Sequence, residues 1–524
     1  MAPEPRAGRP VDAGGSSELP LPPAQGRTGT TVPMLRRDLV IAALLGLASV
    51  VWSGLGSWVP SIWVDEAATI TATRRSWAEL WRLLGNIDAV HGLYYAGLKL
   101  WFTIIATGPV TLRLPSLLAM GGVVAGTYLL ARRFMRPSVA AVAAAVCALL
   151  PRATWMAIEG RSWAFSALAA VVATLLLVDW VSTARRRLLV GYGIAIAIGI
   201  ALNIYVVFLV AGHAVSLLLV RLPWRRWWLW AGVAAFASAA ASPVILAASA
   251  QRRQLGERVP VSLQDWLGSV FLRQFALGDT PGDASTLVPR WAWSGAAIAI
   301  AVLCWGLAVW WGSQQARTRG RDQTGALLWI GPWLVVAPVV VFGMGLLGSN
   351  LYHPRYFGFL TPAFAIAVGA GLASLNARRV RALVAVVLVA LTIPVFVSQR
   401  EVFAKSGYDW SVVAEFTQRS SAVGDGVYFA DAPSMRLMAA AYPDQFADRR
   451  DLTMVQTPAD EGSLDGTSQA LTTTLLAAAP NRVVAIWSVR AATTESDRAA
   501  FAASGYREAD AWSGPQSTVI LFER

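Results

Sequence analysis

Long stretches without a charged residue constrain the fold of this chain more than any other feature of its sequence. Residues 188–220 are 33 consecutive residues that include no Asp, Glu, Lys or Arg. One helix of that length would extend about 50 Å, whereas the hydrocarbon core of a bilayer is about 30 Å thick. The stretch therefore predicts two membrane-spanning helices joined by a tight turn near Asn203.

Similar apolar runs recur along the chain, and the composition agrees with them. Hydrophobic residues make up 56% of the sequence and charged residues only 14%, which is typical of a polytopic membrane protein. We therefore predict a mainly α-helical fold with about eleven transmembrane helices. The runs that are long enough to span are 39–59, 113–131, 138–156, 163–180, 188–202, 204–220, 229–250, 291–312, 325–348, 357–375 and 380–398.

Arginines gather between these runs and predict the orientation of the chain. The net charge of +13 does not follow a basic stripe between aromatic residues, so nucleic acid is not an expected partner. All six arginine clusters lie in the cytoplasm if the run 92–107 rests at the outer interface instead of crossing. We therefore expect the plasma membrane, a cytoplasmic N-terminus and an extracytoplasmic C-terminus. The clusters lie within 36–37, 132–136, 185–187, 221–226, 317–321 and 378–381.

Composition divides the chain into three parts. Residues 1–35 are rich in Pro, Gly and Ser and predict a disordered cytoplasmic tail. Residues 36–400 form the predicted transmembrane module, with outer loops at 60–112 and 251–290. Residues 401–524 carry more charge and predict a small extracytoplasmic α/β domain. Its expected strands are 427–431, 482–489 and 517–522, and its expected helices are 409–419 and 495–504.

Acidic residues return at the predicted outer face. The first outer loop contains Asp65 and Glu66, and a later one contains Glu159 and Arg161. Transfer of a sugar to a hydroxyl needs a carboxylate that takes the hydroxyl proton, and positive charge or a metal beside the leaving group. Arginine forks suit a lipid-phosphate leaving group. These residues, with Arg355 on a third outer loop, are the types that such a reaction needs.

Several short motifs resemble the signature of the GT-C glycosyltransferases. WVDEA (63–67), DAVHGLYY (88–95) and RLPS (113–116) look like the motifs of that superfamily's first outer loop. The most similar branch contains protein O-mannosyltransferases and lipid A aminoarabinose transferases. IEGRSWAF (158–165) is similar to the second acidic motif of the family, and HPRYFGFLTPAFA (353–365) to its late Arg-Tyr motif. The resemblance covers residues 38 to about 430.

This resemblance implies an integral membrane glycosyltransferase that acts on the extracytoplasmic face. The sugar would arrive on a polyprenyl phosphate, because nucleotide sugars are made in the cytoplasm. The arginine-rich, lysine-poor composition and the segment DAVHGLYY resemble actinobacterial members of the family. This favours polyprenyl-phosphate mannose as the donor, with an arabinofuranosyl or other pentose donor as the alternative. A glycolipid, a polysaccharide or a protein of the cell envelope is the implied acceptor, and the reaction would invert the anomeric carbon.

The resemblance also implies roles for particular residues. Asp65 would be the general base, and Glu159 a second catalytic acid. A divalent ion, Mg²⁺ or Mn²⁺, is a possible cofactor, and Asp65 and Glu159 would be its ligands. This sequence departs from the family at Gly92, where proline often follows the histidine, and at Glu159, where some relatives have aspartate. The implied substrate-binding residues are Glu66, Asp88, His91, Tyr94, Arg161, His353 and Arg355.

Structural roles and a different class of protein remain alternatives. Asp65 could cap a helix, and Glu159 could pair with Arg161 or another neighbour. His213 lies inside a predicted span, where we expect a neutral ring bonded to a neighbouring helix. A transporter or flippase of lipid-linked sugars would place charged groups near the bilayer midplane and show internal repeats. Here the acids gather at one rim, and no repeat is evident.

Overall fold

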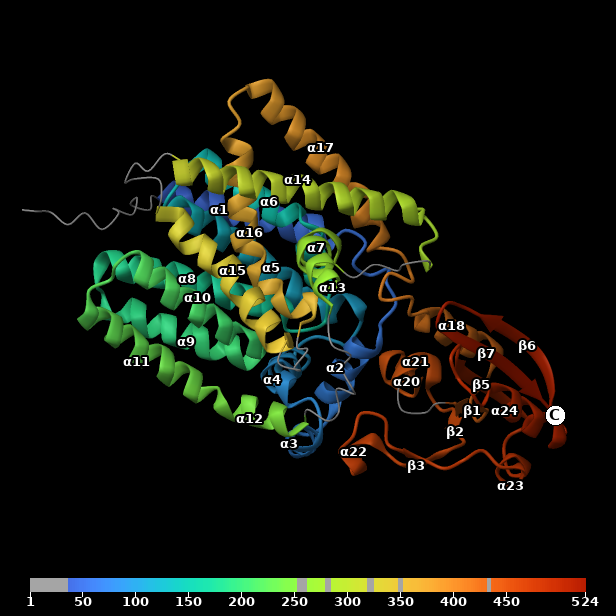
Figure 1. Cartoon of the computed structure of the whole chain (residues 1–524). Helices are drawn as coiled ribbons and strands as arrows, with labels where there is room; N and C mark the ends of the chain where they lie inside the picture. The colour runs from blue at the N-terminus through green and yellow to red at the C-terminus, as the bar shows by residue number, and fades with distance from the viewer. Residues whose placement is uncertain (1–35, 252–261, 279–283, 318–324, 347–351, 431–434) are drawn as a thin grey trace, which may run out of the picture.

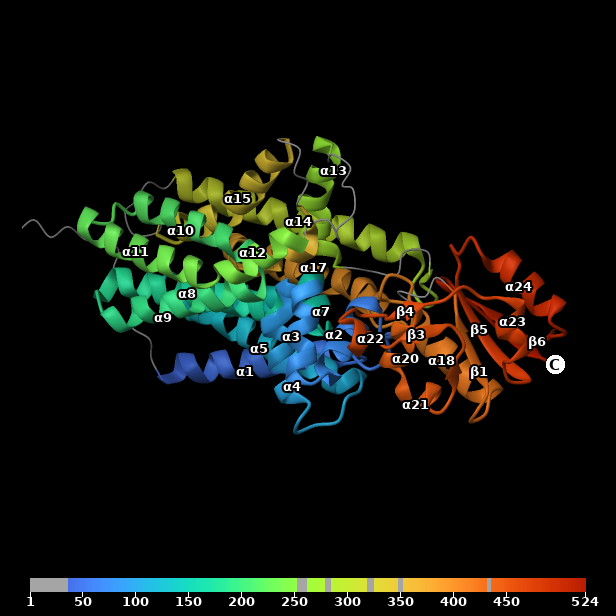
Figure 2. The ribbon, with the colours of Figure 1, turned by 90° about the horizontal axis from the view of Figure 1, so that it is seen from below.

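The computed structural model describes residues 36–251, 262–278, 284–317, 325–346, 352–430 and 435–524. The predicted tail 1–35 and two parts of the predicted outer loop 251–290, residues 252–261 and 279–283, lie outside these ranges. Long helices pack side by side, and a region with a β-sheet lies at one end of them (Figures 1 and 2). The first helix begins at the opposite end of the bundle, at the left of Figure 2.

Each of the eleven apolar runs of the sequence coincides with a helix or with a bent pair of helices. By length and composition, seven helices of the described residues can cross a membrane, or nine if two bent pairs are each one span. The predicted mainly α, polytopic membrane fold is thus confirmed, while the number eleven stays a prediction. The helices are α1 (Arg36–Gly54), α5 (Pro109–Arg132), α6 (Pro137–Leu149) with α7 (Pro151–Ala157), α8 (Trp163–Thr183), α9 (Arg186–Leu202), α10 (Val207–Leu219), α11 (Trp224–Ala240) with α12 (Ser242–Ala250), α14 (Arg290–Arg317), α15 (Gly325–Leu346), α16 (Thr361–Ala373) and α17 (Arg378–Ser398).

The turn predicted near Asn203 is confirmed. Helix α9 ends at Leu202, and a short 3-10 turn, η2 (Ile204–Val206), leads into α10. The side-chain oxygen of Asn203 accepts a hydrogen bond from the backbone N–H of Tyr205 at 3.1 Å, and this bond caps the turn. His213 on α10 is buried, with its ring nitrogens 3.0 Å from Thr174 Oγ1 and 3.3 Å from Tyr192 Oη. The expected contact with neighbouring helices is therefore present.

Two predicted spans bend in the middle, which the hydrophobic pattern did not reveal. The axes of α6 and α7 differ by 63°, and those of α11 and α12 by 46°. Each bend lies directly before a proline, Pro151 or Pro243, within the first turn of the second helix. Leu150, which precedes Pro151, has left the α conformation (φ −57°, ψ 131°), as expected for a residue before proline. Pro243 is the second residue of α12, and its missing N–H cannot bond to the carbonyl oxygen of Ala239 in α11, which interrupts the helix at that point.

The run 92–107 forms only a short helix. Helix α4 (Gly92–Trp101) has ten residues, so it extends about 15 Å and cannot cross a bilayer core. Tyr95 and Leu98 face the protein interior, whereas Leu100 and Ile104 are exposed. With α2 (Val64–Arg74) and α3 (Trp77–Asn86), α4 forms a compact segment, the predicted outer loop, beside the C-terminal region (Figure 2).

The C-terminal region is a sheet with helices on both faces. The strand order β2-β1-β5-β7-β6 is parallel from β2 to β5 and antiparallel at β7 and β6. The predicted strands and helices are confirmed here, whereas β6, the short strands and the short helices were not predicted. The sheet strands are β1 (Gly426–Phe429), β2 (Arg450–Asp451), β5 (Arg482–Ser488), β6 (Arg507–Ser513) and β7 (Ser517–Glu523); β3 (Met454–Gln456) and β4 (Thr467–Ser468) pair separately, and the helices are α18 (Trp410–Ser420), α20 (Leu437–Ala441), α21 (Pro443–Phe446), α22 (Pro458–Glu461), α23 (Thr473–Ala477) and α24 (Thr494–Ala503).

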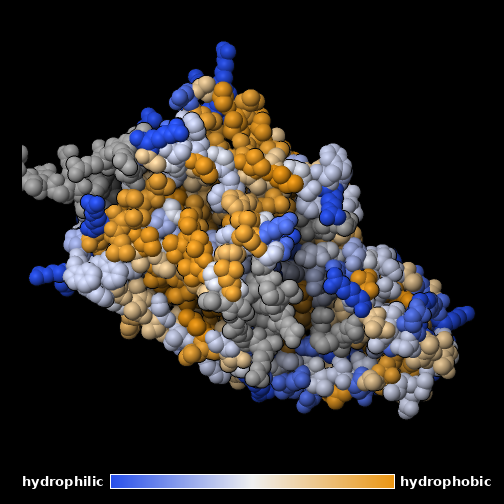
Figure 3. Space-filling model, viewed as in Figure 1, coloured by the Kyte–Doolittle hydropathy of each residue, from blue (hydrophilic) through white to orange (hydrophobic). Residues whose placement is uncertain are grey.

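One face of this sheet joins the outer loop in a common apolar core. Val484 and Ile486 of β5 pack with Trp410 of α18, and the same cluster includes Ala67 and Ile70 of α2. Hydrophobic side chains cover much of the helical bundle, while the C-terminal region shows a mixed, more hydrophilic surface (Figure 3). The bundle is therefore the membrane-embedded part, and the outer loop lies between the bundle and the sheet.

Candidate functional site

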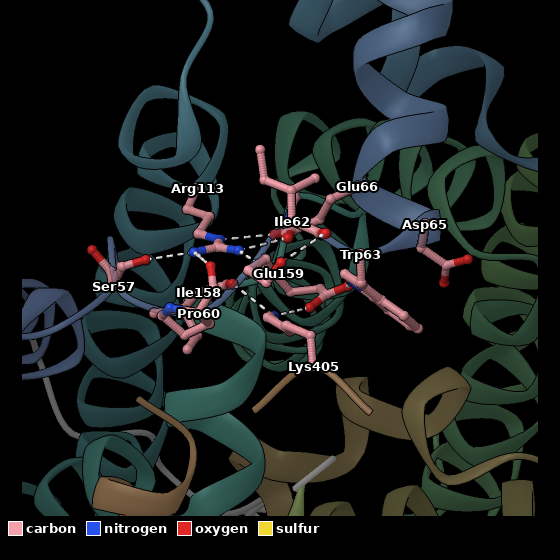
Figure 4. Close-up of polar contacts among 12 residues, drawn as sticks. Ser57, Pro60, Ile62, Trp63, Asp65, Glu66, Arg113, Ile158, Glu159 and Lys405 are labelled. Carbon is pink, nitrogen blue, oxygen red and sulfur yellow. Dashed lines mark hydrogen bonds and ion pairs between the residues drawn. The ribbon is translucent and has the colours of Figure 1, made fainter. Parts of the chain in front are cut away.

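Helix α2 places the two adjacent acids in its first turn. Successive residues of an α-helix point about 100° apart, so neighbouring side chains diverge. Figure 4 shows the result: Glu66 points toward Arg113, and Asp65 points away from both. The two carboxylates therefore belong to different clusters.

The first cluster is buried and electrically balanced, and we call it the Glu66 cluster (Glu66, Arg113, Glu159 and Lys405). Arg113 donates from Nε to Oε1 of Glu66 at 2.9 Å and from Nη2 to Oε2 at 2.7 Å. Both side chains are completely buried. Burial by itself raises the pKa of Glu66, but Arg113 and Lys405 lower the pKa by more than burial raises it. The pKa of Glu66 therefore lies below its ordinary value.

Glu66 also ties the two acidic loops together. Its Oε1 accepts a hydrogen bond from the backbone N–H of Gly160 at 3.0 Å. A side chain at position 160 would come within 2.7 Å of Leu112, so only glycine allows this close approach. Arg113 donates to the carbonyl oxygens of Ser57 (2.6 Å) and Pro60 (3.0 Å). Glu66 and Arg113 thus hold the segment before α2 against the loop at Gly160.

Glu159 completes the Glu66 cluster. Its carboxylate is fully buried, forms an ion pair with Lys405, and accepts a hydrogen bond from Trp63 Nε1 at 2.8 Å (Figure 4). Burial raises the pKa of Glu159, and the nearby Glu66 adds to this effect against the opposite influence of Lys405. The carboxylate of Glu159 therefore contacts protein groups on both oxygens and is closed to solvent.

The second cluster carries an excess of positive charge, and we call it the Asp65 cluster (Asp65, Arg161 and Arg355). Asp65 Oδ1 lies 3.3 Å from Arg161 Nη2, and Oδ2 accepts a hydrogen bond from Arg355 Nη1 at 2.9 Å. The Asp65 side chain is 22% exposed and that of Arg355 21%. Burial alone raises the pKa of Asp65, but Arg161, Arg355 and His91 lower it below the ordinary value.

Aromatic rings surround the guanidinium of Arg355. Its Cζ lies 5.7 Å from the ring centroid of Trp63, 6.0 Å from that of Trp163 and 5.6 Å from that of Tyr356. Such ring faces attract a cation and fix its plane without neutralising its charge. His353 is exposed, and its Nδ1 lies 3.4 Å from the backbone nitrogen of Arg355 at the start of η6 (Pro354–Leu360). The late motif therefore positions one arginine.

The remaining predicted residues lie behind Arg161. Arg161 Nη1 donates to Tyr95 Oη at 2.7 Å, and Tyr95 Oη donates to Asp88 Oδ2 at 2.7 Å. The ring of His91 lies 5.9 Å from that of Tyr95. Burial and Arg161 lower the pKa of His91 to about 4, against the influence of Asp88 and Asp65, so this histidine is neutral at pH 7.

Not every predicted residue reaches the Asp65 cluster. Tyr94 is buried, with its ring 5.9 Å from that of Phe165. Glu66 and Glu159 contact the buried cluster described above. The sequence had not assigned a role to Lys405, Tyr95 or Trp63. Lys405 carried one signal that could have suggested a role: it is one of only two lysines among 44 basic residues.

The predicted metal ligands do not fit a divalent ion. Asp65 lies between two arginines and Glu159 pairs with a lysine, so cations of the protein already balance both carboxylates. Over the part of the chain that the structure describes, no group of three or more His, Cys, Asp or Glu side chains could hold a metal. We therefore derive no step through a metal ion.

Comparison with solved structures identifies the fold. The apo structure of ArnT from Cupriavidus metallidurans aligns with a TM-score of 0.54 at 13% identity, over 91% of this chain and 97% of that chain. The structure of the same protein bound to undecaprenyl phosphate gives 0.50 over the same shares. The oligosaccharyltransferase of Archaeoglobus fulgidus reaches only 0.46 at 12% identity, over 79% of this chain and 64% of that chain.

No protein-family model and no curated protein matches the sequence. The structural likeness to ArnT, a member of the GT-C superfamily, therefore shows the fold of this chain. The expected GT-C fold is confirmed: this chain is a multi-pass membrane protein with that fold.

Proposed function

We propose that the protein is an integral membrane glycosyltransferase that moves a sugar from a polyprenyl phosphate to a cell-envelope acceptor. One observation carries the proposal: Asp65, a partly exposed carboxylate, lies between the guanidinium groups of Arg161 and Arg355. The cluster combines an ionised base with a net positive charge. Proton removal from a hydroxyl and stabilisation of a phosphate leaving group require this combination.

In the proposed reaction, Asp65 accepts the proton of an acceptor hydroxyl. The oxygen attacks the anomeric carbon of the sugar as its O–H bond breaks. The bond between the anomeric carbon and the phosphate oxygen breaks on the opposite side, and its electron pair leaves with the polyprenyl phosphate. One displacement of this kind inverts the anomeric configuration and requires no sugar bound covalently to the enzyme.

The two arginines would offset the charge that develops on the phosphate. A guanidinium has five N–H donors in a fixed fork, so it can bind a carboxylate and a phosphate oxygen at the same time. Tyr95 holds the guanidinium of Arg161, and the aromatic rings hold that of Arg355. Fixed guanidinium groups need less reorganisation during the reaction. The lowered pKa of Asp65 keeps the carboxylate ionised at neutral pH.

A transporter accounts less well for this arrangement. Asp65 lies on α2, which is beside the C-terminal region (Figures 1 and 2), whereas Arg161 lies between α7 and α8 and Arg355 in η6. Transporters instead place their charged sites near the bilayer midplane, on broken helices. The position of the cluster therefore favours chemistry at the membrane surface.

Mannose is the sugar that we propose, and an arabinofuranosyl or other pentose is the alternative. The decisive experiment incubates membranes that contain the protein with each labelled polyprenyl-phosphate sugar. We expect transfer from the mannose donor to a glycolipid, polysaccharide or protein fraction. Direct transfer from GDP-mannose in membranes depleted of lipid carrier would overturn the proposal.

We also propose that the reaction face and the C-terminal region lie outside the plasma membrane, with the N-terminus in the cytoplasm. This orientation follows from the arginine clusters. Single cysteines introduced at Glu79 and Arg450 should both be labelled by an impermeant thiol reagent added to intact cells. The native Cys147 and Cys304 are buried and provide little background. Labelling of only one position would contradict the orientation.

A further inference from the structure

The segment between α17 and α18 extends from the bundle into the Glu66 cluster. Its residue Lys405 has a side chain that is only 2% exposed. The ammonium group forms an ion pair with Glu159, donates to the carbonyl oxygen of Ile158 at 2.8 Å, and lies 5.1 Å from the ring centroid of Trp155. Lys405, which lies outside the motifs that resemble the family, thus neutralises Glu159 of the motif IEGRSWAF (Figure 4).

Lysine at this position stands out in a chain that has only one other lysine. An ammonium group is a compact point charge, whereas a guanidinium is a wide planar fork. Trp155, Ile158 and Glu159 all contact the buried ammonium group, and a compact point charge can serve these three contacts at once. A buried carboxylate without its cation would be strongly unfavourable, so Lys405 determines whether Glu159 can stay in place as an anion.

Glu159 in turn connects to the proposed reaction centre through one side chain. Its Oε1 accepts a hydrogen bond from the indole N–H of Trp63 at 2.8 Å. The face of that indole lies 5.7 Å from the guanidinium of Arg355, which donates to Asp65 at 2.9 Å. The orientation of Trp63 therefore links the buried cluster to the exposed one.

The segment that carries Lys405 is fixed on the C-terminal sheet. The carboxylate of Asp409 accepts hydrogen bonds from the backbone N–H of Gln516 (3.0 Å) and from the N–H (2.9 Å) and hydroxyl (2.6 Å) of Ser517. Between Lys405 and Asp409 the chain turns sharply, with positive φ at Ser406 (52°) and Gly407 (80°). The C-terminal region thereby sets the position of Lys405.

We propose that Lys405 is a positioning residue for the transfer reaction: through Glu159 and Trp63 it holds Arg355 against Asp65, and it makes the C-terminal region a working part of the active site. This inference rests on the proposed function. It assigns the C-terminal region a role in turnover beyond the hydroxyl of Tyr408, which faces Asp65.

The first test compares Lys405→Met with Lys99→Met, which removes the only other lysine. Both full-length proteins are purified in detergent and assayed with polyprenyl-phosphate mannose and, separately, the pentose donor. A displacement of about 1 Å at a reacting group can lower turnover by on the order of 10²-fold. We expect a kcat loss of this size for Lys405→Met, a smaller change in KM, and a change within about twofold for Lys99→Met.

The pH profile separates positioning from a general loss of structure. The groups that face Asp65 are Arg161, Arg355, His91 and the hydroxyl of Tyr408, and the charge of Glu159 also acts on Asp65. If Lys405→Met loosens Arg355, the pKa of Asp65 rises, and the acid limb of kcat/KM moves to higher pH. A loss of folded protein alone would lower activity at every pH and leave the limb where it was.

A double variant keeps the inference testable if Lys405→Met does not fold. Lys405→Met with Glu159→Gln removes both buried charges, and the glutamine carbonyl can still accept the indole N–H of Trp63. We expect this variant to fold, to turn over within about tenfold of the wild type, and to keep the acid limb where the wild type has it.

Each outcome is decisive. A folded Lys405→Met enzyme with wild-type turnover and an unchanged acid limb would overturn the inference and leave the proposed function intact. A folded double variant without restored turnover would do the same. Absence of transfer by the wild-type protein with either donor would overturn the proposed function and the inference with it.

Discussion

The Asp65 cluster and the Glu66 cluster start at adjacent residues but differ in burial and in charge. Two acids and two bases balance in the Glu66 cluster, and its carboxylates are closed to solvent. In the Asp65 cluster one acid meets two arginines, and about a fifth of the Asp65 side chain is exposed. A balanced buried cluster holds loops together, whereas an exposed cluster with excess positive charge can bind an anion.

Two neighbouring acids can therefore have different roles: Glu66 stabilises the structure, and Asp65 is available for the proposed reaction. Glu66 accepts bonds from Arg113 and Gly160 and so fixes the two acidic loops. Asp65 then projects from a rigid first helical turn, with its carboxylate held at a defined place between the arginines. A reacting group works best on a rigid support, and Glu66 supplies that support.

The largest effect on folding is expected for Glu66→Gln. The substitution leaves Arg113 buried without its counter-charge, which typically costs about 3–5 kcal/mol. Thermal unfolding in detergent should occur at a clearly lower temperature, while turnover per folded molecule stays within about tenfold of wild type. The neighbouring Asp65→Asn is the matched control and should unfold close to wild type. Equal unfolding temperatures for Glu66→Gln and wild type would remove the distinction between the clusters.

Arg355→Met should lower turnover without a comparable loss of stability. Removing one group that stabilises developing charge typically costs about 10²–10³-fold in kcat. Arg355→Lys keeps the charge but not the fork and should fall between this variant and wild type. Arg498, which pairs with Glu508 on the exposed surface of the C-terminal region, provides a control arginine. If Arg355→Met turned over as fast as Arg498→Met, the Asp65 cluster would not be the phosphate site.

The smallest effect concerns pH. The pKa of Asp65 lies below 3.8, because its two arginines and His91 favour the ionised form more than burial opposes it. The ionised form of Asp65, which acts as the base, is therefore present at neutral pH. It is lost as the pH falls through the lowered pKa of Asp65. We expect kcat/KM to decline only below about pH 4. An acid limb near neutral pH would point instead to Glu159, whose pKa burial raises.

Much of the fold could be predicted because hydrophobic patterning is a local property. Uncharged runs indicated the positions of the long helices, and the short apolar runs in Arg482–Ser488 and Ser517–Glu523 indicated two strands of the sheet. Strand β6 (Arg507–Ser513) was missed because it is an exposed edge strand without an apolar face. The bends before Pro151 and Pro243 were missed because both sides of each bend are equally apolar.

The site could be predicted only in part. Residue type and expected side of the membrane singled out Asp65, Arg161 and Arg355, which the structure brings together. The partners of Glu66 and Glu159 were not predictable, because Arg113 and Lys405 lie 47 and 246 residues away in the sequence. Such pairings depend on tertiary packing, and no local pattern in the sequence encodes them.

The most direct test of this account measures sugar transfer from the labelled polyprenyl-phosphate donor by Asp65→Asn and by wild-type protein. Asparagine keeps the shape of the side chain but cannot take the hydroxyl proton, and loss of a positioned base typically lowers the rate by about 10²–10⁴-fold. The account predicts a loss of this size with normal folding and normal donor binding. Near-wild-type transfer by folded Asp65→Asn protein would contradict it.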